Sequence, residues 1–186
     1  MSEHREIEAK FLEVDVAGLT QRLHGLGAHD LGEDMFEEVI IYDADLTWPE
    51  QERMVRIRKM RDQVVVSYKH HQKRELSGTE EIEFVASDYE KAKQVFAAIG
   101  MRVFREQEKK RHSYELTGTK VEFDTWPGIP TYVEIEGEDE EAVRSVSKQL
   151  GLDWSRAVFK SAGKVIEEDY GIPVMGYRYF TFTKTG

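Results

Sequence analysis

The stretch Glu6-Ile7-Glu8-Ala9-Lys10-Phe11 alternates between charged and apolar residues. Residues two apart share a face of a β-strand, so this stretch predicts a strand with one charged face and one apolar face. In an ordinary half-buried strand the polar face meets water and the apolar face meets the core. Taken alone, the charged face of this strand is therefore expected to be solvated.

The same alternation recurs along the chain. It predicts eight strands, near residues 5–13, 35–43, 53–60, 63–71, 79–86, 102–116, 120–126 and 131–137. Seven of these strands carry charged or polar pairs on one face: Glu6 and Glu8 with Lys10, Arg56 with Arg58, Ser67 with Lys69, Glu81 with Glu83, Lys109 with Arg111, Glu122 with Asp124, and Glu134 with Glu136. Acidic pairs and basic pairs mostly fall on different strands, as expected if they meet across a shared space.

Four helices are predicted between and after the strands. The first covers 16–26, with Asp15 as its N-cap and Gly27 at its end. The second covers 88–99, where Ser87 and Glu90 form a capping box and Gly100 ends the helix. The others cover 139–150 and 155–169, and residues 177–183 alternate weakly, which indicates an added edge strand.

Amphipathic helices need an apolar sheet surface to cover, and the apolar faces of these strands supply one. This favours apolar faces turned outward under the helices and charged faces turned inward. About eight strands is the number at which a β-barrel closes with room for one small ligand. The predicted fold class is therefore α+β, a closed eight-stranded antiparallel β-barrel with a charged interior and helices outside, in a single domain over residues 1–186.

Composition narrows the classes of partner. The formal net charge of −10 disfavours a broad nucleic-acid surface, although a local cluster of Lys and Arg can still bind a small anion. The absence of cysteine excludes a disulfide scaffold and a thiolate zinc site. Residues 1–10 lack an apolar signal core, and no apolar run approaches the roughly 18–20 residues that span a bilayer. We expect a cytoplasmic protein with no membrane partner, and a homodimer paired through its alternating tail is one expected assembly.

Several motifs then follow one another in a recognisable order. Glu6-Ile-Glu8-Ala-Lys10 matches an E-x-E-x-K signature; Val55-Arg56-Ile57-Arg58, Lys69, the pair Glu81 and Glu83, Lys109-Lys110-Arg111 and Glu134-Ile-Glu136 come after it. With these motifs the chain resembles the CYTH domain family, also called triphosphate tunnel metalloenzymes, and within it the class IV adenylyl cyclase-like proteins. The resemblance covers roughly residues 5 to 137. Family members often carry a Ser-Tyr pair at the late helix, where this chain has Ser161-Ala162.

The resemblance implies a tunnel that holds a divalent metal and a triphosphate. The implied metal ligands are Glu6, Glu8, Glu134 and Glu136, and such hard oxygen donors suit Mg²⁺ or Mn²⁺. The implied triphosphate ligands are Lys10, Arg56, Arg58, Lys69, Lys109 and Arg111, of which Lys10, Lys69 and Arg111 are the expected catalytic residues. Alternation from Arg111 favours Lys109 over Lys110 as the inward residue. Further tunnel acids are expected at Glu81, Glu83, Glu122 and Asp124.

Three functions fit these residues. The leading one is a metal-dependent phosphohydrolase (hydrolase) acting on inorganic triphosphate or an organic triphosphate. The second is a class IV adenylyl cyclase (lyase) that converts ATP to cyclic AMP and pyrophosphate, and the third is a non-catalytic binder of polyphosphate or nucleotide. Neither a G-x-x-x-x-G-K-[ST] loop nor a G-x-G-x-x-G turn is present. Trp48, Trp126 and Tyr132 could stack on an adenine or thiamine ring, although packing is the commoner role of such residues.

Overall fold

The computed structural model describes residues 4–61, 63–71 and 79–186, without the side chains of residues 4–6, 71 and 79. All eight predicted strands are present, and a short ninth strand lies in the tail. Their bounds are β1 His4–Phe11, β2 His29–Tyr42, β3 Arg53–Met60, β4 Gln63–His71, β5 Thr79–Ala86, β6 Arg102–Leu116, β7 Thr119–Thr125, β8 Tyr132–Gly137 and β9 Tyr179–Phe180.

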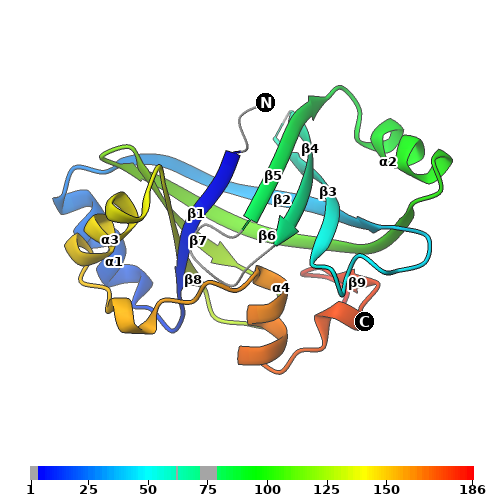
Figure 1. The fold of residues 1–186 in the computed structure, drawn as a ribbon. Helices are drawn as coiled ribbons and strands as arrows, with labels where there is room; N and C mark the ends of the chain where they lie inside the picture. Colours follow the sequence, from blue (N-terminus) through cyan, green and yellow to red (C-terminus); the bar gives the residue numbers. More distant parts are fainter. Residues whose placement is uncertain (1–3, 62, 72–78) are drawn as a thin grey trace.

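The first eight strands form one antiparallel, strongly curled sheet in the order β2-β3-β4-β5-β1-β8-β7-β6, and β6 pairs along β2 as well (Figure 1). Among the residues that the structure describes, the pairing between β1 and β5 runs from His4 opposite Glu81 to Glu6 opposite Thr79. Along its other edge β1 pairs with β8, from Ile7 opposite Gly137 to Phe11 opposite Val133. The sheet is therefore a curled half-barrel, and the full closure expected from the sequence is not reached.

The helices confirm the predicted order with two corrections to their ends. Their bounds are α1 Val16–Gly25, α2 Tyr89–Ala98, α3 Glu140–Gln149 and α4 Ala162–Lys164, which continues as the π-turn η2 Val165–Asp169. Asp15 caps α1 as predicted. The cap of α2 is Asp88, not Ser87, because the Asp88 carboxylate accepts a hydrogen bond from the backbone N–H of Lys91 at 2.8 Å.

The fourth helix begins later than the predicted residue 155. Only the short 3₁₀ turn η1 Trp154–Arg156 forms there. Val158 is held in extended geometry because its backbone exchanges two hydrogen bonds with Lys10 of β1, at 2.9 and 2.8 Å. The helical segment can therefore start only at α4.

The predicted inside-out arrangement is confirmed, since the apolar cores lie on the outer faces of the strands. One core joins β1, β6, β7 and β8 to α1 and α3, which lie side by side at one end of the molecule (Figure 1). A second core joins β2, β3 and β4, with α2 packed against it at the other end. None of the described helices is long and apolar enough to cross a membrane.

Candidate functional site

The inner surface of the curled sheet, called here the charged face, collects charged side chains from most of the strands. Those buried there include Lys10, Glu38, Arg105, Lys109, Arg111, Glu122, Asp124 and Glu134. Charged groups removed from water must be paired, coordinated or neutralised. The pairing of each charge therefore shows what the site is built to hold.

Arg111 stands at the centre of an acidic wall formed by β6, β7 and β8. Its Nε and Nη2 atoms lie 2.5 and 2.7 Å from the two oxygens of Asp124, and Nη2 lies 3.4 Å from Glu134. Nη1 contacts Glu122. Burial by itself would lower the pKa of Arg111, but Asp124 and Glu122 raise it well above its usual value. Arg111, a predicted phosphate ligand and catalytic residue, thus contacts three carboxylates.

Lys109 faces the same interior, and Lys110 turns away toward the ring of Phe182. The Lys109 Nζ atom lies 2.7 Å from Asp124 and 5.4 Å from the ring centres of both Phe36 and Trp126. Burial, followed by the nearby charge of Arg111, lowers the pKa of Lys109 to about 8. Its ammonium therefore loses its proton more readily than that of an exposed lysine.

Lys10 lies between two predicted metal ligands. Its Nζ atom is 2.5 Å from Glu8 and 3.8 Å from Glu134. Burial and the adjacent Glu8 raise the pKa of Glu134. Glu136 lies opposite Glu8 in register and pairs with the exposed Lys120 at 3.1 Å, so it lies nearer to solvent. The side chain of the fourth predicted ligand, Glu6, lies outside the described residues.

The opposite wall, on β2 to β5, carries the two predicted arginines. Arg58 Nε donates to Glu38 Oε1 at 2.7 Å, and Arg56 lies 3.9 Å from the same oxygen. Glu81 lies 3.5 Å from Arg56 and 3.2 Å from Lys69. Burial would raise the pKa of Glu38, but Arg58 and Arg56 lower it strongly, so this carboxylate stays ionised. We call Arg56, Arg58 and Glu38 the arginine wall.

Among the remaining predicted acids, Glu122 and Asp124 belong to the acidic wall described above. Glu83 lies on the strand β5 in register with Ser67, but its side chain is exposed. The structure therefore gathers all six predicted cations on the charged face, and leaves Glu83 and Glu136 nearer to solvent than the other described acids.

Four residues of the site were missed in the sequence: Phe36, Glu38, Arg105 and Gln107. Arg105 and Gln107 continue the i, i+2 series of Lys109 and Arg111 back along β6, and extending that series would have identified them. Phe36 and Glu38 were hidden because β2 is buried on both faces near its end, so its sequence shows no clean alternation.

The described carboxylates can supply some of the ligands of a magnesium ion, but not a complete set. No three described carboxylate or imidazole groups are placed to hold a metal. Glu8 and Glu134 are adjacent, and each offers the hard oxygen donors that Mg²⁺ prefers. Magnesium sites commonly use one or two carboxylates and take their other ligands from phosphates and water. A pair of carboxylates on this wall is compatible with that kind of site.

The aromatic residues considered as stacking surfaces pack within the protein. Trp126 is buried, donates from Nε1 to Tyr132 Oη at 3.0 Å and stacks on Phe180. Trp48 meets Tyr68 edge to face. These contacts agree with the packing role.

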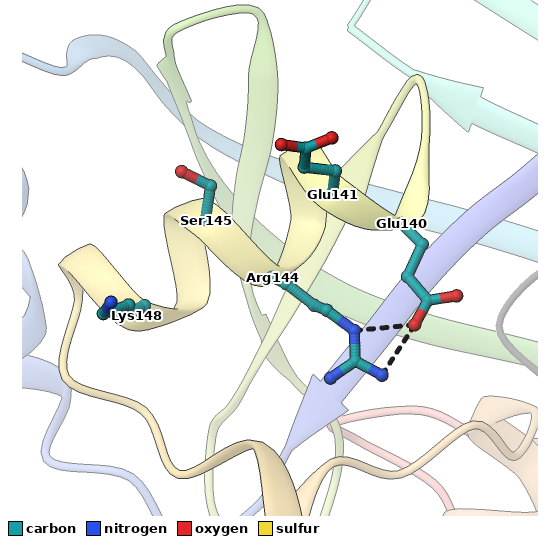
Figure 2. A pocket seen from close by; sticks show the side chains of 5 residues that line it. All are labelled: Glu140, Glu141, Arg144, Ser145 and Lys148. Atoms are coloured by element: carbon teal, nitrogen blue, oxygen red, sulfur yellow. Dashed lines mark hydrogen bonds and ion pairs between the residues drawn. The ribbon is translucent and has the colours of Figure 1, made fainter.

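A hollow of about 550 Å³ lies elsewhere, on the solvent side of α3. Figure 2 shows the five side chains along it, with Glu140 bonded to Arg144. All five are exposed, so this surface has the features of a solvated helix face and not of a catalytic site.

Comparisons with known proteins agree on the fold. A family model described as the CYTH domain matches residues 4–167. The PH1012 protein of Pyrococcus horikoshii OT3 is 26% identical, with a TM-score of 0.71 over 84% of this chain and 96% of that one. No curated protein matches the chain.

Two more distant structures show similarity of fold alone. A candidate adenylate cyclase from Vibrio parahaemolyticus is 13% identical, with a TM-score of 0.75 over 89% of this chain and 99% of that one. A candidate adenylyl cyclase from Hippeastrum, described as having a dominant triphosphatase activity, is 15% identical, with a TM-score of 0.63 over 89% of this chain and 95% of that one.

Proposed function

The chain belongs to the CYTH domain family, and from that premise we propose that it is a metal-dependent phosphohydrolase acting on a triphosphate bound to the charged face. The observation that carries the proposal is the set of six lysines and arginines that converge there, each beside a carboxylate. A triphosphate carries several negative charges in a row. A surface with cations on facing walls is suited to such a ligand.

The cations would bind the phosphates in two ways. Arg56 and Arg58 offer planar forks that can make bidentate hydrogen bonds to phosphate oxygens. Lys10, Lys69 and Lys109 offer compact charges that can follow the phosphates as their geometry changes. Because each of the six cations has a carboxylate partner in the free protein, a bound phosphate would take the place of that partner.

Most of the rate enhancement would come from positioning and from charge stabilisation. We assign Lys10 and Lys69 to the phosphate that is transferred, and Arg111 to holding the acidic wall in place beside it.

Glu8 and Glu134, together with Glu6 and Glu136, are the proposed holders of Mg²⁺ or Mn²⁺. A bound divalent ion would neutralise charge that develops on the phosphate oxygens. The protein's own contribution is to supply carboxylate oxygens on one wall and to keep Lys10 close to them.

A product assay tests the proposal. Purified protein is incubated with tripolyphosphate, ATP and thiamine triphosphate, each with Mg²⁺ or Mn²⁺, and the products are separated. Release of orthophosphate is expected. Cyclic AMP with pyrophosphate from ATP would instead establish a cyclase, and binding without turnover of any substrate would contradict an enzymatic role.

A further inference from the structure

A series of hydrogen bonds connects the C-terminal segment to the arginine wall. Arg105 Nη1 donates to the backbone carbonyl of Val174 at 2.9 Å, and Arg105 Nε donates to Gln107 Oε1 at 2.8 Å. Gln107 Nε2 donates in turn to Glu38 Oε2 at 2.7 Å. The other oxygen of Glu38 accepts from Arg58 Nε at 2.7 Å. Three buried side chains therefore link Val174 to Arg58.

This arrangement fixes the direction of the Gln107 amide. Arg105 can only donate, so the atom of Gln107 that faces it must be the oxygen. The amide nitrogen is then directed at Glu38, which can only accept while it is ionised. The reversed amide would place two donors together at Arg105 and two acceptors together at Glu38. Arg105 thus selects the amide orientation that anchors one oxygen of Glu38.

Anchoring that oxygen has a consequence for Arg58. A carboxylate free to turn tends to bind a guanidinium through both oxygens. With Oε2 held by Gln107, Glu38 contacts Arg58 through Oε1 and Nε only. The terminal nitrogens Nη1 and Nη2 of Arg58 are then the atoms that phosphate would meet.

The C-terminal segment is itself firmly attached at this place. Val174 belongs to the 3₁₀ turn η3 Val174–Gly176, and both Val174 and Phe180 pack in a buried cluster with Trp126 and Tyr132. β9 pairs in parallel with β6, with Phe180 opposite Gln107. The family match ends at residue 167, so residues 171–186 lie beyond it.

We propose that Arg105, held by the backbone carbonyl of Val174, and Gln107 together position Arg58 for phosphate binding by keeping Glu38 from occupying its terminal nitrogens. Arg105 and Gln107 are positioning residues, because they would act on phosphate binding through Glu38 and Arg58. The inference rests on the proposed function, since only that function supplies a phosphate ligand. Its geometry comes from the hydrogen bonds that join Val174 to Arg58.

Kinetic analysis of Gln107→Leu tests the link, because leucine retains the bulk and removes both hydrogen bonds. The KM for tripolyphosphate is expected to rise about tenfold, the lower end for losing a hydrogen bond to a charged group, with a smaller change in kcat. Arg105→Met should act in the same direction. Gln149→Leu makes the same chemical change on the exposed side of α3 and should leave both parameters unchanged.

A double-mutant cycle separates positioning from general loosening. In an Arg58→Ala background, Gln107→Leu should have no further effect on KM, because the residue through which it acts is gone. An unchanged KM in Gln107→Leu, or effects that simply add, would overturn the proposal.

A crystal structure of unliganded Gln107→Leu distinguishes failure of this inference from failure of the proposed function. Glu38 is expected to turn and bind Arg58 through both oxygens. An unmoved Glu38 would contradict the positioning role even if the enzyme hydrolyses triphosphates. Wild-type protein that binds no triphosphate would instead contradict the proposed function, while a turned Glu38 would still support the link from Arg105 to Arg58.

Discussion

Individual cations on the charged face differ in how completely the protein neutralises them. Among the side chains that the structure describes, Arg111 contacts three carboxylates, whereas Arg58 shares one carboxylate with Arg56. When an anionic ligand displaces the carboxylate partners of a cation, the interaction energy that is given up is smaller for a cation with fewer partners. We therefore expect Arg58 to contribute more to phosphate binding than Arg111, which acts mainly by holding the acidic wall together.

Arg58→Ala should weaken binding of tripolyphosphate by about 1.5–3 kcal/mol, the range for a hydrogen bond to a charged group. Titration calorimetry measures the change. Arg144→Ala removes an exposed arginine from α3 and serves as the control. An affinity for Arg58→Ala equal to that of the control would place Arg58 outside the binding site.

Loss of the proton from the Lys109 ammonium should set an upper pH limit on the reaction. Its pKa is lowered to about 8, so the ammonium is present below that pH and is lost as the pH rises through it. Since kcat/KM reports the groups of the free enzyme, kcat/KM is expected to fall above about pH 8. Lys109→Arg stays charged throughout and should shift the fall to higher pH. The same profile in both proteins would exclude Lys109 as its cause.

Glu8→Gln should abolish metal-dependent turnover, because an amide is a weaker ligand than a carboxylate for Mg²⁺. The fold should survive, since the substitution is isosteric, and thermal unfolding checks this. Glu140→Gln makes the same change on the exposed face of α3 and should remain fully active. An active Glu8→Gln protein would remove Glu8 from the proposed metal site.

Among the secondary-structure elements, those with regular alternation were predicted best. The bounds of β3, β4 and β5 agree with the sequence prediction, because charged or polar residues alternate with apolar ones over the central part of each strand. β2 starts earlier than predicted, since a register shift between Asp30 and Gly32 interrupts its alternation.

Tertiary contacts account for the other errors. Nothing local in the sequence shows that Val158 will pair with Lys10, and this pairing delays the fourth helix. The links from Arg105 to Val174 and from Gln107 to Glu38 each join residues 69 apart in the chain, so no local pattern contains them. The pairs Arg56 with Arg58 and Lys109 with Arg111 could be recognised because they repeat at strand spacing, whereas the contacts of these cations depend on the register of neighbouring strands.

The helix α1 offers a test of the outer core. Leu23 is fully buried against the strands, whereas Leu26 at the end of the same helix is 41% exposed. Leu23→Ala should lower the free energy of unfolding by about 2–5 kcal/mol, the cost of a cavity in a packed core. Leu26→Ala should cost much less. Equal losses in denaturant unfolding would contradict the assignment of the core to the outer face of the sheet.

For the whole molecule, the arrangement reverses the usual one for a sheet. Apolar faces are covered from outside by α1, α2 and α3, and charges fill the concave interior. Burying so many charges costs folding stability, because apolar residues would pack such an interior at a lower cost in free energy. The charges are therefore expected to have a role in binding a ligand. The fold as a whole therefore favours a function that uses the charged face.

The most direct measurement is a crystal structure with tripolyphosphate and Mn²⁺, whose anomalous scattering locates the ion. We predict phosphates between Arg56 and Arg58 on one wall and Lys10 and Lys109 on the other, with manganese beside Glu8 and Glu134. Phosphate and metal bound only to the outer surface, with the ion pairs of the charged face unchanged, would contradict the account.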